Sequence, residues 1–548
     1  MTEQAGGTSR RLEGQKILAL LINAVFLAFR TTCPAATAVH EVHDRHDLLE
    51  VPLGEAVIQR GEQPPGALRV VVVPTAARRH QLREALFKKL CAAPTPGHRL
   101  RATAAPPGNG ASWPHAILHS ARRPGATRPA RCVPAGQRSL ARGAGVTLGV
   151  QPWSVVDLFS GGGGMSYGFH AHPSFVVAGA ADAQIGKPST GRGLLGCNAT
   201  YVANIGIRPV EADLSAADPG QICAAMQLPS GSVSVLAACP PCTGFSRTLA
   251  HNHLRDDARN TLVGVIPRYV ELLRPQIVLM ENARELVTGR FSGHLRSLLS
   301  ELDGLNYAAM AVTHFLNDFG LPQKRERALV IAVRRPLRLL GLDDLWSGYR
   351  VSPKATHVRR AIGDLPPAEA GVQDPADPMH VSPSLRSAVN RSRLAAIPPD
   401  GGGWADLARH PEAGQLLTAA MRRRVMLRQL GSHPDVYGRL RWDRPAVTIK
   451  RECGHIGNGR YAHPEQDRLC TVREMAILQG FPRSYTFAGT LANMYRHVGD
   501  AVPPVISYQL AGLCAWTLTG IRPGPAELIL PGCHLSAADI DEGPAGSG

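Results

Sequence analysis

Short apolar runs alternate with helix-like stretches between residues 155 and 333, and this rhythm restricts the fold more than any other feature of the sequence. Each run has the length and β-branched content of a strand, and Gly, Pro or polar residues follow it. The runs are VVDLF (155–159), FVVAGAAD (175–182), VSVLAAC (233–239), IVLMEN (277–282) and ALVIAV (328–333). Strands that alternate with helices form a mostly parallel sheet covered on both faces. We therefore predict a doubly wound α/β domain whose ligands bind beyond the carboxyl ends of the strands.

The same rhythm divides the chain into parts. Ala, Pro, Arg and Gly dominate the sequence before it, which indicates a basic and largely irregular extension with one helix-like stretch at 80–90. After it comes a long Arg-, Pro- and Gly-rich stretch without a clear period. We expect the extension over 1–150, a catalytic domain over 151–334, an inserted smaller domain over 335–441, a return to the first domain over 442–520 and a C-terminal tail over 521–548.

The charge balance favours a polyanionic partner. Lys and Arg outnumber Asp and Glu by 60 to 43, which gives a formal net charge of +17 at pH 7. Nucleic acid is the first candidate for such a chain, although a merely soluble basic surface would have the same composition.

The cysteines and the apolar N-terminal run indicate an intracellular protein without a metal site. The 11 cysteines are scattered, with no repeated CxxC pair and no HExxH motif, so a reduced setting is expected. The run at 17–29 is too short to span a bilayer. Its flanking residues resemble a secretory signal, but a buried helix or a misassigned start is the preferred interpretation.

A glycine-rich turn, DLFSGGGGMSYGF at 157–169, lies between the first expected strand and a helix-like stretch. Glycines allow a ligand to approach the backbone closely, and a helix start offers free N–H groups. Two acids follow later strands: Asp182 suits a ribose diol, and Asp213 suits the amine of a base. A helix cap or a turn is the alternative role for each acid.

The sequence CPPCTGFSR places Cys242 directly after an apolar strand and two prolines. The prolines remove backbone donors and fix the chain, so the thiol is presented from a rigid turn at the sheet edge. Cys242 is therefore a candidate nucleophile. The alternatives are a small buried hydrophobe, or a redox or metal pair with Cys239.

Glu281 and two arginines are expected near the same sheet edge. A carboxylate among apolar neighbours can have a raised pKa and can share the proton that an attacked heteroaromatic ring needs. Arg325 and Arg327 alternate in QKRER, so both can point to one face of an extended segment and reach one ligand. A capping or surface acid and a solvated charge run are the alternative interpretations.

Taken in order, six motifs resemble those of the DNA (cytosine-5)-methyltransferase family, of the bacterial type. They are DLFSGGGG, CPPCTGFS, ENA, QKRER, the stretch from RPAVTIK to HPEQDRLCTVREMAILQGFP, and GDAVPP. Six spaced motifs in family order are far more specific than a lone motif. The resemblance covers residues 155–519 and implies a Rossmann-like doubly wound methyltransferase sheet with an inserted target recognition domain. It also implies that the chain transfers a methyl group from S-adenosylmethionine to C5 of a cytosine in a specific duplex DNA sequence.

The resemblance gives four residues a part in the chemistry. Cys242 would attack C6 of a cytosine that has swung out of the duplex, and Glu281 would bind the ring N3 and the exocyclic amine. Arg327 would lie near the cytosine O2, and Arg325 would brace the site and a nearby phosphate. The residues that it places beside the methyl donor are Phe159, Gly161, Gly163, Asp182, Asp213, Pro241, Leu262, Asp500 and Ala501.

Three positions depart from the family pattern. Thr243 stands where Gln is common, Ala283 where Val is usual, and Asp500 where Asn is usual. The first departure affects how the loop fills the gap that the flipped base leaves. Asp500 keeps the shape of Asn but adds a carboxylate beside the cofactor.

The resemblance also implies the partners. Duplex DNA is the expected partner, a cognate restriction endonuclease is a further candidate, and the chain is expected to act as a monomer in the bacterial cytoplasm, with no metal and no membrane. In the inserted segment, the basic residues that suit phosphate contacts are Arg359, Arg360, Arg391, Arg393 and Arg422 to Arg424. The rival hypotheses are an RNA cytosine-5 methyltransferase and a catalytically silent DNA-binding regulator on the same fold. The size of the inserted segment argues against the first, and the joint presence of the four catalytic candidates argues against the second.

Overall fold

The structure is a computed structural model that describes residues 151–187, 192–228, 233–241, 256–428 and 435–542, together with the backbone of three strands nearer the N-terminus. The chain divides into two compact units, Met1–Leu140 and Ala141–Gly548. In the described part of the chain, no helix combines the length and the apolar character that a membrane crossing requires.

The first unit contains an antiparallel sheet that the sequence did not predict. Its strands are β1 (His46–Val51), β2 (Ala56–Gly61) and β3 (Leu68–Val72), paired in that order. These short apolar runs, which Pro- and Gly-containing segments separate in the sequence, were not among the expected strands. The helix expected at 80–90 lies outside the described residues.

The second unit is built on a seven-stranded sheet in the order β11-β13-β10-β9-β4-β5-β8. Neighbouring strands run parallel from β10 to β8, whereas β13 is antiparallel to both of its neighbours. The strands are β4 (Trp153–Leu158), β5 (Phe175–Asp182), β8 (Val210–Glu211), β9 (Val235–Ala238), β10 (Ile277–Ala283), β11 (Tyr307–Phe315) and β13 (Glu326–Arg334). The predicted α/β sheet is thus confirmed, and it contains all five of the strands expected from the apolar runs.

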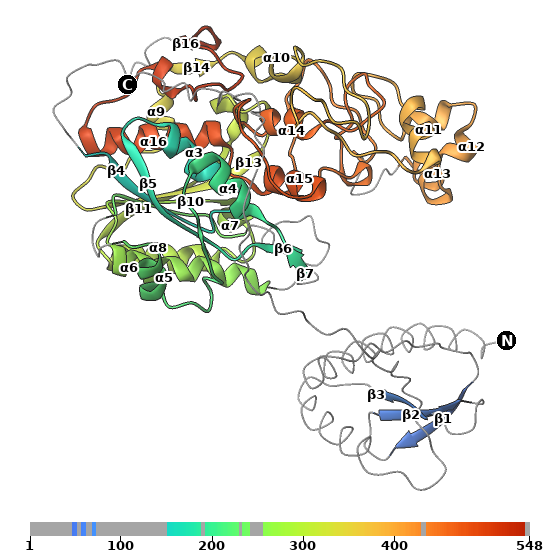
Figure 1. Cartoon of the computed structure of the whole chain (residues 1–548), viewed down its shortest axis with the longest axis horizontal. Coiled ribbons are helices and arrows are strands. Elements are labelled where there is room, and N and C mark those ends of the chain that lie inside the picture. The colour runs from blue at the N-terminus through green and yellow to red at the C-terminus, as the bar shows by residue number, and fades with distance from the viewer. Residues whose placement is uncertain are drawn as a thin grey trace, which may run out of the picture. The chain divides into compact units, whose positions relative to one another are not determined.

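Helices cover both faces of this sheet, as Figure 1 shows. One face packs against α3 (Gly164–Ala171) and α16 (Pro504–Thr519), and the other against α5 (Pro219–Ala225), α6 (Ile266–Leu273) and α8 (Gly293–Gly304). Successive strand residues point to opposite faces, so Val155 belongs to the first core and Val156 to the second. Because both faces are buried, the strands are almost continuously apolar.

A second part of this unit has its own core and lies beside the sheet (Figure 1). We call residues 358–501 the outer lobe. Its main core contains α10 (Val358–Ile362), α14 (Val472–Leu478) and α15 (Leu491–Asp500). A smaller core at its far end lies among α11 (Ala388–Ala396), α12 (Ala413–Leu416) and α13 (Ala419–Met426).

The observed cores do not follow the domain boundaries that we expected at residues 335 and 441. Residues of α9 (Leu342–Trp346) and β14 (Tyr349–Val351) belong to the core under the sheet, not to the outer lobe. The C-terminal segment belongs there too, because Leu528, Leu530 and Leu535 are buried in that core. Its last strand, β16 (Ile540–Glu542), pairs with β14, so the expected tail is a packed part of the sheet domain.

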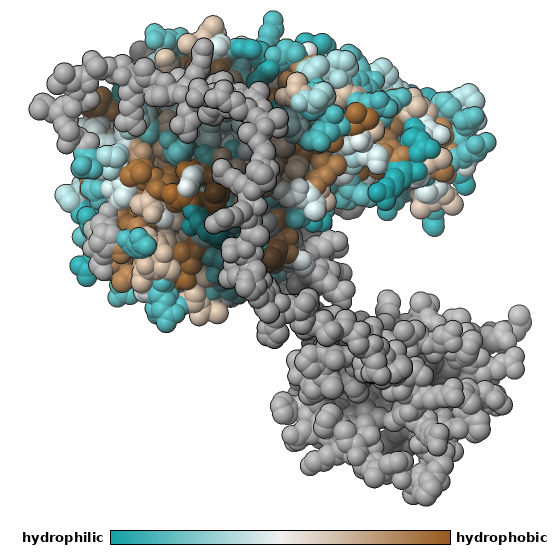
Figure 2. Space-filling model, viewed as in Figure 1, coloured by the Kyte–Doolittle hydropathy of each residue, from teal (hydrophilic) through white to brown (hydrophobic). Residues whose placement is uncertain are grey.

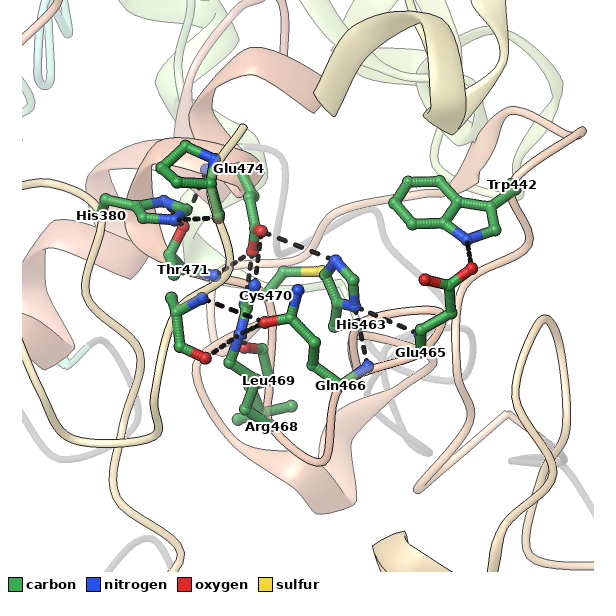
Figure 3. Close-up of polar contacts among 12 residues, drawn as sticks. His380, Trp442, His463, Glu465, Gln466, Arg468, Leu469, Cys470, Thr471 and Glu474 are labelled. Carbon is green, nitrogen blue, oxygen red and sulfur yellow. Dashed lines mark hydrogen bonds and ion pairs between the residues drawn. The ribbon is translucent and has the colours of Figure 1, made fainter. Parts of the chain in front are cut away.

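A buried ion pair stands at the centre of the outer lobe (Figure 3). Arg468 donates from Nη1 and Nη2 to the two carboxylate oxygens of Glu474, at 2.7 and 2.8 Å. Glu474 also accepts from the backbone N–H of Thr471 at 2.6 Å, which completes the capping box of α14. Burial would raise the pKa of Glu474, but the hydrogen bonds and charge of Arg468 hold it below its ordinary value. Thr471 and Glu474 of the CTVREMAILQGFP motif therefore have a structural role, because their contacts stabilise the outer lobe.

Candidate active site

The carboxyl end of β10 brings Glu281 next to both expected arginines. Glu281 Oε1 lies 2.9 Å from Arg327 Nε and 4.0 Å from Arg325 Nε. The register explains the first contact, because Ala283 of β10 lies opposite Arg327 on the antiparallel strand β13. Glu281 is only 6% exposed, so the structure places a carboxylate and two guanidinium groups together in a largely dry site.

Arg325 is held from behind by segments that are distant in the sequence. Its Nη1 donates to the carbonyl of Ile449 at 3.1 Å, and its Nη2 donates to the carbonyl of Ala501 at 3.4 Å. Because only 2% of Arg325 is exposed, it braces the site but offers no surface to a phosphate. The phosphate contact predicted for this residue stays a prediction, and the burial of its side chain argues against it.

The proline turn after β9 is fastened to β10. Asn282 Nδ2 donates to the carbonyl of Pro240 at 3.1 Å, and the backbone N–H of Glu281 donates to Cys239 Sγ at 3.3 Å. Asn282 is fully buried and was missed in the sequence, although it directly follows the acid of the ENA motif. The turn that leads to the expected nucleophile is thus fixed relative to Glu281. Cys242 itself and Thr243 lie outside the described residues.

The glycine-rich turn and the expected ribose acid are joined at the ends of β4 and β5. The backbone N–H of Gly161 donates to Asp182 Oδ2 at 2.9 Å, and the N–H of Gln184 donates to Asp182 Oδ1 at 2.6 Å. Phe159 and Gly161 both have positive φ, at 61° and 53°. A Cβ added to Gly161 would have no atom of the described residues within 4 Å, so this part of the structure leaves space open above the turn.

Gly163, which is also expected beside the cofactor, packs closely against neighbouring side chains. It precedes α3 with φ 93°, and a Cβ there would lie 3.1 Å from Tyr485 Oη and 3.2 Å from Tyr201. This glycine lets the turn pack closely against the outer lobe, where Tyr485 also donates a hydrogen bond to the carbonyl of Gly162.

Four more residues are expected beside the cofactor, namely Asp213, Pro241, Leu262 and Ala501. Asp213 is exposed and accepts from the N–H and the hydroxyl of Ser215 at 3.0 and 2.6 Å, as a turn residue does. Pro241 is exposed, and Leu262 is partly buried in the 3-10 helix Ala258–Val265. Ala501 is buried at the end of α15, and its carbonyl accepts from Gln479 Nε2 at 2.8 Å.

A buried acid that the sequence did not single out lies beneath the glycine-rich turn. Asp157 is fully buried and accepts from Ser166 Oγ at 2.6 Å, while Ser166 and Tyr201 share a hydrogen bond of the same length. Burial raises the pKa of Asp157 to about 7, and the hydrogen bond from Ser166 only partly opposes this effect. The sequence signal that could have identified Asp157 was an acidic residue among the apolar residues of an expected strand.

Asp157→Asn should make the stability of the protein less dependent on pH. A carboxyl whose pKa is raised in the folded state binds its proton more tightly there, so its stabilising contribution is present in acid and is lost as pH rises toward 7. Between pH 5 and pH 8 the free energy of unfolding of the wild type should fall by about 3 kcal/mol relative to that of the variant. Urea unfolding at several pH values measures this difference, with Asp303→Asn as a control at a 71% exposed side chain. Parallel pH profiles for the wild type and Asp157→Asn would contradict it.

Most of the arginines expected to contact phosphate are engaged within the protein. Arg393 is buried, where it donates to the carbonyl of Leu416 at 2.5 Å and stacks on Tyr437. Arg360 pairs with Asp539 at 2.8 Å. Further internal contacts are those of Arg391 with the Leu385 carbonyl, of Arg359 with the Trp442 ring, and of Arg422 with the Gly414 and Leu417 carbonyls. The expectation for Arg393 is therefore wrong, because local sequence does not reveal its burial.

Comparison with known proteins agrees with this geometry. Residues 153–515 match the family described as C-5 cytosine-specific DNA methylase. The chain is 31% identical over 374 residues to the Type II methylase M.HgiDII of Herpetosiphon aurantiacus, covering 67% of this chain and 97% of that protein. It is 28% identical to the Type II methyltransferase M.AgeI of Thalassovita gelatinovora, covering 65% and 98% of the two chains. It is also 28% identical to DNA (cytosine-5)-methyltransferase 1A of Oryza sativa subsp. japonica, covering 51% of this chain and 22% of that protein.

Proposed function

This chain belongs to the family of C-5 cytosine-specific DNA methylases, and from that premise we propose how its residues carry out the reaction. It is a DNA (cytosine-5-)-methyltransferase, and DNA is its substrate. We assign it to the modification half of a Type II restriction-modification system, since its bacterial relatives are named Type II methylase and Type II methyltransferase. The observation that carries the mechanism is the 2.9 Å pair of Glu281 and Arg327, beside the proline turn that leads to Cys242.

The residues at the glycine-rich turn fit S-adenosylmethionine, which supplies the methyl group when it is bound. The space above Gly161 admits a ligand close to the backbone. The half-buried carboxylate of Asp182 suits a ribose diol, and Ser160 Oγ is buried without a hydrogen-bond partner in the described structure. The other residues that we propose to line the S-adenosylmethionine site are Phe159, Asp213, Pro241, Leu262, Asp500 and Ala501.

The nucleophile and the groups that bind the cytosine ring have complementary roles in the reaction. The Cys242 thiolate forms a bond to C6 of a cytosine that has left the stack, and the π electrons of the C5–C6 bond shift through C4 toward N3. Glu281 binds N3 and the exocyclic amine, where negative charge develops, and Arg327 stabilises the charge at O2. C5 then takes the methyl group from the sulfonium of the bound donor, which leaves as S-adenosylhomocysteine. A base removes the C5 proton, and loss of the cysteine restores the C5–C6 double bond.

We propose that the far end of the outer lobe reads the DNA sequence. Figure 2 shows hydrophilic side chains gathered there around α11, α12 and α13, with apolar residues between them. No residue of α13 is buried, and this helix carries Arg423 and Arg424 without an acidic residue. Met426 follows them with 83% exposure. A helix with an exposed basic face suits the electrostatic field of duplex DNA.

Replacing Arg423 and Arg424 together with alanine should weaken DNA binding about tenfold at 0.1 M salt and reduce the salt slope by about 2, because two phosphate contacts are lost. Fluorescence anisotropy with a duplex across a salt series measures both quantities. Arg335→Ala is the matched control, since Arg335 directly follows β13 of the sheet, outside the outer lobe, and pairs with Asp303 at 2.7 Å. Equal loss in the control would show that general charge, not α13, is responsible.

Expression of the full chain in a methylation-free host, followed by bisulfite sequencing of DNA and RNA, tests the whole proposal. We expect 5-methylcytosine at one short DNA sequence. Methylation confined to RNA would favour the RNA enzyme, and an unmethylated host would favour the silent regulator.

A further inference from the structure

We infer that Arg451 is a positioning residue for the cofactor site, because it ties the end of β5, which carries Asp182, to the last turn of α15. The inference rests on the proposed function, since the role of Asp182 toward the methyl donor is part of that proposal. Arg451 would not touch the reacting atoms. It would act through the backbone that aims Asp182.

The guanidinium of Arg451 bridges two separate segments. Its Nη1 pairs with the carboxylate of Asp500, the last residue of α15, and its Nη2 donates to the carbonyl of Ile185 at 3.1 Å. Ile185 begins β6 (Ile185–Lys187), three positions after Asp182. Gln184 lies between them and donates its N–H to Asp182 at 2.6 Å. One side chain thus connects the turn that orients the ribose acid to the helix that ends beside Ala501.

The backbone that carries Arg451 is itself fixed. A Cβ added to Gly499 would lie 2.3 Å from the carbonyl oxygen of Lys450 and 2.6 Å from the nitrogen of Arg451, so α15 packs directly on this segment. The neighbouring Ile449 carbonyl accepts from Arg325 at 3.1 Å. Arg451 therefore projects from a loop that is anchored both to α15 and to the arginine that braces Glu281.

The charges give the bridge a second purpose. The Asp500 carboxylate, whose side chain is 29% exposed, adds a negative charge near Asp182, and the guanidinium of Arg451 pairs with it. Arg451 thus offsets the carboxylate that Asp500 adds at this edge. A planar guanidinium can hold a carboxylate and a carbonyl at once, whereas an ammonium group is a single point charge.

Loss of the bridge should weaken cofactor binding without slowing the chemical step. In the full chain, Arg451→Met should raise the Kd for S-adenosylhomocysteine and the KM for S-adenosylmethionine about tenfold, with kcat within about twofold of wild type. For Arg451→Lys, the Kd for S-adenosylhomocysteine and the KM for S-adenosylmethionine should lie between those of the wild type and those of Arg451→Met.

Titration calorimetry with S-adenosylhomocysteine in the absence of DNA provides the main readout, and the KM for duplex DNA and the melting temperature are measured beside it. Arg496→Met is the matched control, because Arg496 lies on α15 and its guanidinium contacts Glu452 at 3.0 Å and Asn493 at 2.9 Å. We expect the control to bind S-adenosylhomocysteine like the wild type.

Two results would overturn the inference while leaving the proposed function intact. Either Arg451→Met binds S-adenosylhomocysteine as tightly as Arg496→Met, or it loses cofactor affinity, DNA affinity and melting temperature together, as a general structural lesion would. A wild-type chain that neither binds S-adenosylhomocysteine nor methylates DNA would instead overturn the proposed function, and the inference with it.

Discussion

Replacing Cys242 with serine is expected to abolish methyl transfer to DNA, with kcat reduced by more than about 10³-fold, while duplex binding remains within a few fold. A serine hydroxyl occupies nearly the same space as the thiol but is far less nucleophilic toward C6. Radiolabelled methyl transfer and anisotropy measure the two properties separately. Cys533→Ser is the control, because Cys533 is only partly buried and lies in the C-terminal segment.

A trapping experiment makes this prediction sharper. Duplex DNA that carries 5-fluorocytosine at the target should form a covalent complex with the wild type, because the C5 proton that must leave is absent. No such complex should form with Cys242→Ser. A denaturation-resistant complex with the variant, or normal turnover by it, would remove Cys242 from the mechanism.

Glu281→Gln is expected to lower kcat by about 10²- to 10³-fold and to change the Kd for S-adenosylhomocysteine by no more than about threefold. The amide cannot supply a proton as charge develops on the ring, and it leaves Arg327 without its carboxylate partner at 2.9 Å. Single-turnover methylation and calorimetry measure the two effects. Glu285→Gln, four residues along the same motif, should retain nearly full activity. A normal rate for Glu281→Gln would exclude this acid from the site.

The sequence predicted the strands that are buried on both faces, and it missed those whose pairing depends on distant residues. The stretches that became β4, β5, β9, β10 and β13 are mostly apolar, so their own composition identifies them. β8 contains only two residues, Val210–Glu211, too few to give a periodic signal. β11, Tyr307–Phe315, is mostly half-buried at the sheet edge and is held by antiparallel pairing with β13.

The same distinction holds for the candidate site. Motif spacing predicted Glu281, Arg325 and Arg327 because their chemistry is concentrated in two short stretches. It could not reveal Asn282 on the Pro240 carbonyl, or Arg451 on the carbonyl of Ile185, 266 positions away. These contacts exist only after the sheet and the outer lobe have packed. Burial was equally hidden, which is why Arg393 seemed suited to a phosphate.

The packing of α16 against α3 has a consequence for synthesis on the ribosome. The Ser507 hydroxyl accepts from the N–H of Gly168 at 3.1 Å and donates to the carbonyl of Gly164 at 3.0 Å, so a contact across more than 300 positions closes the first face of the sheet. During translation, β4, β5 and α3 emerge long before α16, and the apolar surface that α16 will cover stays open while the whole outer lobe is made. Nascent chains that stop before residue 504 should therefore be strong clients of chaperones, and release should come only with the last helix.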